Sequence, residues 1–233
     1  MKIIGVISLG TGGVGKSTIS LALATSLHPL DLTILLESTS YIYKTKIQEN
    51  ETLGSSFFDV ENYSMIKLYN NNLGIIGIPD SEIYDAELTR RILYTTINAV
   101  KLSTNREPKF IIFDFPAIIN ADALESVDLV IIVSRPIEEI LNILFTQYRP
   151  IAIGRLVKPV RFIINFFPPK LNPNKEKDLV KLGINPQKFR EANPIIIPEL
   201  NVPKTSAGTF EVAKYIVKKK LLEPIIREIV YEH

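Results

Sequence analysis

Short apolar runs alternate with segments of helical periodicity along most of the chain. Continuous apolar runs bounded by polar or turn residues are typical of strands buried on both faces, and they occupy residues 3–9, 31–36, 73–79, 109–114, 129–134, 160–167 and 195–198. Helices are predicted at residues 19–27, 82–103, 122–128, 136–148, 175–182 and 209–230. This alternation predicts one α/β domain over residues 1–233, with a mainly parallel sheet and helices on both faces, a three-layer arrangement.

Two segments depart from the alternation. Residues 41–72 scatter aromatic side chains among polar ones, which predicts a loop and short-helix insertion packed on the domain; the alternative is a surface for a partner. Residues 168–194 are polar and rich in proline, which predicts a surface excursion carrying the short helix at 175–182.

The C-terminal helical segment carries an apolar stripe, and Pro224 is expected to start a new helix there or to kink the existing one. The stripe consists of Leu221, Leu222, Ile225, Ile226, Ile229 and Val230. We expect it to dock on the domain. Membrane-surface binding is the alternative, because Lys218, Lys219 and Lys220 precede the stripe.

Composition narrows the chemistry. The 233 residues include no cysteine and two histidines, which excludes disulfides, cysteine-ligated zinc or iron–sulfur centres and a histidine-rich metal site. The net charge of +2 is too balanced to indicate nucleic-acid binding by itself. Because no apolar run approaches the roughly 18 residues of a membrane-spanning helix, we expect a cytoplasmic protein.

The strongest chemical signal lies between the first strand and the first helix. Gly10, Gly15, Lys16 and Ser17 form the pattern G-x-x-x-x-G-K-S in that strand–loop–helix context, which predicts a P-loop. Its glycines allow successive N–H groups to surround a phosphate chain, while the lysine reaches the outer phosphates and the serine hydroxyl can ligate Mg²⁺. The residues predicted to bind nucleotide here are Gly12, Gly13, Val14, Gly15, Lys16, Ser17 and Thr18.

Two carboxylates follow apolar runs and are predicted to face the same crevice. Glu37 follows the run at 31–36, and Asp114 ends the run at 109–114 in the manner of a Walker B strand. Carboxyl ends of parallel strands border the ligand crevice of an open α/β sheet. We therefore predict catalytic roles for Lys16, Glu37 and Asp114, and Mg²⁺ contacts for Ser17 and Asp114.

This series of motifs resembles the ParA/MinD family of P-loop ATPases over nearly the whole chain. The resemblance rests on the glycine loop, the run ending in Asp114, the run at 129–133, Asn165 and Pro198. It implies Mg-ATP binding, an ATP-dependent homodimer that separates on hydrolysis, and a protein partner that stimulates hydrolysis. It also implies that Asn165 reads the adenine edge, that Pro198 lies beside the base and that Asp114 supports Mg²⁺ through water.

Two positions depart from the family pattern. The signature lysine that would reach the partner's phosphates is replaced by Thr11, and Thr39 replaces a second carboxylate after Glu37. Loss of either group can lower a hydrolysis rate by orders of magnitude. The protein is therefore expected to be a weak ATPase, with a catalytically decayed ATP-binding scaffold as the alternative. Thr11 also makes the loop sequence more similar to that of dethiobiotin synthetase and related amide-forming enzymes, but no second motif supports that function.

Non-specific DNA is a further candidate partner. No base-reading module is apparent, so the prediction rests on basic side chains that ordinarily form a solvated face. These are Arg90, Arg91, Lys101, Arg149, Arg155, Lys158, Arg161, Lys214 and Lys218 to Lys220.

Overall fold

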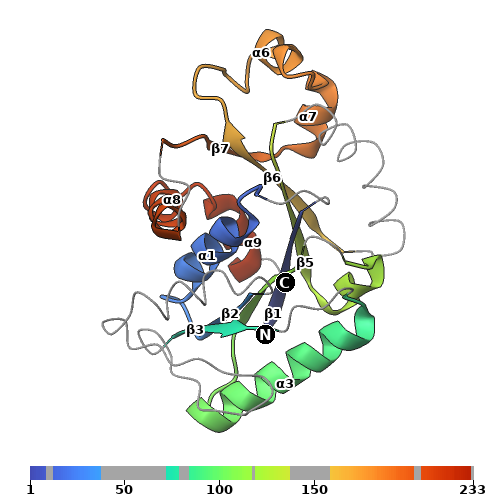
Figure 1. Cartoon of the computed structure of the whole chain (residues 1–233), viewed down its shortest axis with the longest axis vertical. Coiled ribbons are helices and arrows are strands. Elements are labelled where there is room, and N and C mark those ends of the chain that lie inside the picture. The colour runs from blue at the N-terminus through green and yellow to red at the C-terminus, as the bar shows by residue number, and fades with distance from the viewer. Residues whose placement is uncertain are drawn as a thin grey trace.

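In the described part of the chain, a seven-stranded parallel sheet forms the centre of the protein, in the order β3-β2-β4-β1-β5-β6-β7 (Figure 1). The computed structural model describes residues 1–8, 13–37, 72–78, 84–116, 119–136, 158–201 and 206–231. The strands are β1 (Lys2–Ser8), β2 (Thr33–Glu37), β3 (Leu73–Gly77), β4 (Phe110–Asp114), β5 (Leu129–Ser134), β6 (Val160–Phe167) and β7 (Ile195–Pro198). The predicted parallel α/β sheet is confirmed.

Helices cover both faces of this sheet, which gives the predicted three layers (Figure 1). One face carries α1 (Lys16–Leu27), α8 (Ser206–Lys218) and α9 (Glu223–Tyr231), and the opposite face carries α3 (Ala86–Thr104) with the 3₁₀ helix η1 (Ala121–Ser126). Between β6 and β7 lie α6 (Glu176–Lys181) and α7 (Pro186–Ala192).

Each strand supplies both cores because its successive side chains point to opposite faces. In β4, Ile111 and Phe113 join the core beneath α3, whereas Phe110 and Ile112 join the core beneath α1. All five residues of β4 are buried. This two-sided burial explains why the strands read as continuous apolar runs in the sequence.

The structure corrects one predicted helix boundary and adds one helix that was not predicted. The helix predicted from residue 82 begins at Ala86, because Asp85 is extended and its side chain accepts a hydrogen bond from Leu88 N at 2.8 Å. The excursion at 168–194 holds two helices instead of one, and Asn185 caps the helix that was not predicted. The helix predicted at 136–148 and the insertion at 41–72 lie outside the described residues, apart from their end residues Pro136 and Asn72.

The cap of α3 leads to a testable prediction. Replacing Asp85 by alanine removes the acceptor of an otherwise unpaired helical N–H, so the free energy of unfolding should fall by about 1 kcal/mol. Urea denaturation measures this loss. Asp85→Asn keeps an acceptor and should stay close to wild type; an equal loss in both variants would show that the cap is not responsible.

The C-terminal apolar stripe packs on the body of the protein. Leu222, Ile225 and Ile229 are at most 3% exposed and belong to the core beneath α1. Pro224 occupies the second position of α9, so the prediction of a new helix is confirmed. Leu221, Ile226 and Val230 are partly buried against the same core, so the face considered for membrane binding packs mainly on the protein itself. Among the described helices, none combines the length and apolarity needed to cross a bilayer.

Candidate functional site

Polar side chains collect at the carboxyl edge of the sheet. Glu37 ends β2, Asp114 ends β4 and Ser134 ends β5, and all three are at most 1% exposed. Glu37 and Asp114 are direct partners in the register of β2 and β4. The sheet therefore brings the two predicted carboxylates side by side, at the edge where open α/β sheets bind ligands.

The glycine loop joins this edge to α1. Gly13 and Gly15 have φ angles of 72° and 83°, which disfavour any residue with a Cβ. A Cβ on Gly15 would lie 2.1 Å from Asn165 Nδ2, so this position also requires glycine for space. Helix α1 begins at Lys16, and its first N–H groups lie at the loop. Gly12 lies outside the described residues.

Lys16 and Asp114 form a buried ion pair across the site. Lys16 Nζ donates a hydrogen bond to Asp114 Oδ1, and the two residues are 8% and 0% exposed. A buried carboxylate is costly unless it is paired, so this lysine compensates the charge of Asp114. Ser17 and Thr18 follow in the first turn of α1 and are partly exposed.

The donor set fits a magnesium ion that arrives with a phosphate ligand. Asp114 Oδ2 and Ser134 Oγ are buried and have no hydrogen-bond partner among the described residues. Nowhere in those residues do three or more His, Cys, Asp or Glu side chains gather into a metal site made by protein side chains alone. Mg²⁺ commonly binds through one or two carboxylates together with substrate phosphates and water, which this arrangement can provide. When bound, such an ion neutralises charge on phosphate oxygens.

Asn165 links the loop to β6. Its Nδ2 donates to Val14 O at 2.9 Å, and its Oδ1 accepts from Phe166 N at 3.0 Å. An amide can make four hydrogen bonds, so both atoms retain capacity for a further partner. Pro198 ends β7 and pairs in register with Phe167, at the same edge of the sheet. Reading of an adenine by Asn165, with Pro198 beside the base, stays a prediction.

Arg135 is a site residue that the sequence analysis did not identify. It directly follows β5, and its Nε donates to Gly13 O at 3.2 Å, with Nη2 donating to the same oxygen. Its guanidinium carbon lies 5.0 Å from the ring centroid of Phe166. The sequence could have indicated Arg135 by its position immediately after a buried strand, the same observation that indicated Glu37.

The described basic candidates for DNA do not form a single surface. Lys101 pairs with Glu107, and Arg161 pairs with Glu228. Arg90 and Arg91 lie on α3, on the opposite face of the sheet from the lysines of α8 and the turn after it. Arg149 and Arg155 lie outside the described residues. A DNA-binding surface therefore stays a prediction.

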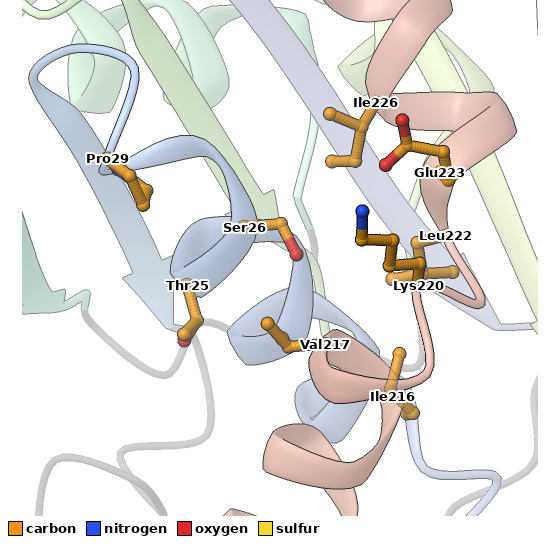
Figure 2. Close-up of a pocket in the computed structure, with 9 residues that line it drawn as sticks. All are labelled: Thr25, Ser26, Pro29, Ile216, Val217, Lys220, Leu222, Glu223 and Ile226. Carbon is orange, nitrogen blue, oxygen red and sulfur yellow. The ribbon is translucent and has the colours of Figure 1, made fainter.

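A pocket of about 190 Å³ lies between α1, α8 and α9, away from this site. Helix α1 starts at the carboxyl edge of the sheet, and the pocket adjoins its other end. Figure 2 shows residues of α1 facing Lys220 and residues at the start of α9. Its lining mixes apolar side chains with the polar or charged Thr25, Ser26, Lys220 and Glu223.

Solved structures share this fold, although no protein-family model and no curated protein matches the sequence. The cell division ATPase MinD of Pyrococcus furiosus is 18% identical with a TM-score of 0.58, and the match covers 96% of this chain and 99% of that one. McdA of Cyanothece, in a complex with ATP, is 15% identical with a TM-score of 0.57, over 99% and 96% of the two chains. A plasmid partition protein of Borrelia burgdorferi bound to AMPPNP is 20% identical with a TM-score of 0.51, over 94% and 98%. The chain therefore has the P-loop fold of MinD, McdA and plasmid partition proteins, the fold that its motif series predicts.

Proposed function

We propose that this protein is a Mg-ATP-binding ATPase that acts as a nucleotide-dependent dimerising switch in the positioning or partitioning of cargo. The observation that carries the proposal is the Lys16–Asp114 ion pair at the junction of the glycine loop and the carboxyl edge of the sheet. Support comes from the shared fold with MinD and McdA, and from neighbours solved with ATP or AMPPNP.

Each side chain has a defined role in the proposal. The loop N–H groups and the amino end of α1 bind the phosphates. With nucleotide bound, Lys16 would contact phosphate oxygens in place of Asp114, and Asp114 with Ser17 would hold Mg²⁺. Glu37, which is buried beside Asp114, is the candidate for orienting the attacking water. Hydrolysis is expected to be slow, because Thr11 provides no cation and Thr39 provides no carboxylate at these two positions of the sequence.

The switch acts through its partners. An ATP-bound homodimer is the proposed active form, with a second protein that stimulates hydrolysis and non-specific DNA as a candidate surface for the dimer. A scaffold held in shape by ATP without turnover is the second candidate function, favoured by the substitutions at positions 11 and 39. Turnover distinguishes the two.

The test is phosphate release by wild type, Lys16→Ala and Thr11→Lys, with oligomeric state measured by gel filtration with and without Mg-ATP. We expect slow release that Lys16→Ala abolishes, a dimer only with Mg-ATP, and faster release by Thr11→Lys. Binding and dimerisation without phosphate release would support the scaffold. A wild-type monomer that binds no ATP would contradict both functions.

A further inference from the structure

Arg135 places a positive charge at the rim of the glycine loop. The strands are parallel, so the residue after β5 lies at the same edge as Asp114 at the end of β4. Two of its N–H groups converge on the carbonyl oxygen of Gly13. A Cβ on Gly13 would lie 3.5 Å from Arg135 Nη2, so the guanidinium is in contact with the loop backbone itself.

The charge of Arg135 is not neutralised within the described part of the chain. Among the described residues, its hydrogen bonds go to one neutral carbonyl group and it takes part in no ion pair. Arg106, Arg161, Arg190 and Arg227 each pair with a carboxylate, whereas Arg90 and Arg91 on α3, like Arg135, have no ion pair among the described residues. An arginine has five N–H donors in a planar fork, so donors remain for an anion after the two bonds to Gly13.

Phe166 holds the guanidinium in place from the other side. Its ring lies under Arg135, and its backbone has a left-handed φ of 61°, a costly conformation for a residue with a Cβ. Asn165 Oδ1 accepts from the Phe166 N–H, which fixes that conformation next to the loop. Arginine, loop and ring therefore form one preorganised cluster, and preorganisation lowers the entropy cost of binding an anion.

We propose that Arg135 is a phosphate-binding residue of the nucleotide site. Its guanidinium, supported by Gly13 and Phe166, binds oxygens of the phosphate chain and supplies a cation at a loop whose position 11 is threonine. Arg135 thereby adds to Lys16 a second positive side chain for the nucleotide. This inference rests on the proposed nucleotide site, and it names a residue that the motif pattern does not include.

The competing explanation is that Arg135 only braces the loop through Gly13. Three variants separate the two explanations when AMPPNP with Mg²⁺ is titrated calorimetrically at several ionic strengths. Arg135→Gln keeps a donor for Gly13 but removes the charge, whereas Arg135→Lys keeps the charge but loses the fork. Arg161→Gln is the matched control, because Arg161 lies near the amino end of β6 and pairs with Glu228.

If Arg135 binds phosphate, Arg135→Gln should raise the Kd for AMPPNP by about tenfold or more and should weaken its salt dependence. Arg135→Lys should lose clearly less affinity, and Arg161→Gln should match wild type. The proposal is overturned if Arg135→Gln binds as tightly as wild type. It is equally overturned if Gln and Lys weaken binding alike with unchanged salt dependence, which is the result expected of a brace. A wild-type protein that binds no AMPPNP would overturn the proposed function as well.

Discussion

Replacing Gly15 by alanine should lower the free energy of unfolding of the nucleotide-free protein by about 2–5 kcal/mol. Two independent costs add at this position. The φ of 83° penalises any Cβ by about 1–2 kcal/mol. The new Cβ would also lie 2.1 Å from Asn165 Nδ2, which forces that buried amide away from Val14 O and costs about 1–3 kcal/mol more. Urea denaturation monitored by circular dichroism measures the sum.

Gly13→Ala is the matched control for Gly15→Ala. Gly13 has a similar φ of 72°, but its added Cβ would meet its nearest neighbour at an ordinary 3.5 Å. It should therefore show the backbone cost alone, about 1–2 kcal/mol. Adding Asn165→Ala to Gly15→Ala should recover part of the larger loss, because it removes the clash. Equal losses at Gly13 and Gly15, with no recovery in the double variant, would contradict the close approach of Asn165 to the loop.

Features that depend on local pattern were predictable from the sequence. The strands are recognisable because both faces are buried, and the glycine loop is recognisable because phosphate binding constrains residue type and spacing together. The start of α7 also has a standard sequence signal, because Asn185 is followed by Pro186. The helix is short and lies in a proline-rich segment, so the sequence analysis did not predict it.

Features that depend on strand order were not predictable in the same way. Arg135 and Gly13 are 122 residues apart, and their contact requires β5 to lie directly beside β1. The bond from Asn165 to Val14 similarly needs β6 to lie next in the sheet. Apolar runs identify strands without giving their order, so the sequence could indicate which residues end strands but not which loop atoms they contact.

Replacing Lys16 by methionine should destabilise the nucleotide-free protein by about 3–5 kcal/mol, as well as removing nucleotide binding. The reason is that Asp114 is 0% exposed and would be left as a buried carboxyl group without its cationic partner, and its Oδ2 already has no partner among the described residues. The matched control is Lys181→Met, which breaks a surface pair with Asp178 in which the lysine side chain is 63% exposed. Such a pair contributes less than about 1 kcal/mol.

The Lys16–Asp114 pair also predicts that the stability cost of Lys16→Met depends on Asp114, which would not hold for a lysine that acts only in catalysis. Asp114→Asn removes the buried charge, so Lys16→Met in that background should cost much less than in wild type. The difference between the two costs is the coupling energy of a double-mutant cycle, obtained from four urea curves. A coupling near zero, with Lys16→Met as mild as Lys181→Met, would mean that the pair is absent in solution. A large coupling would mean that Lys16 neutralises Asp114 in the nucleotide-free protein, so that phosphate and Mg²⁺ binding must replace an existing ion pair.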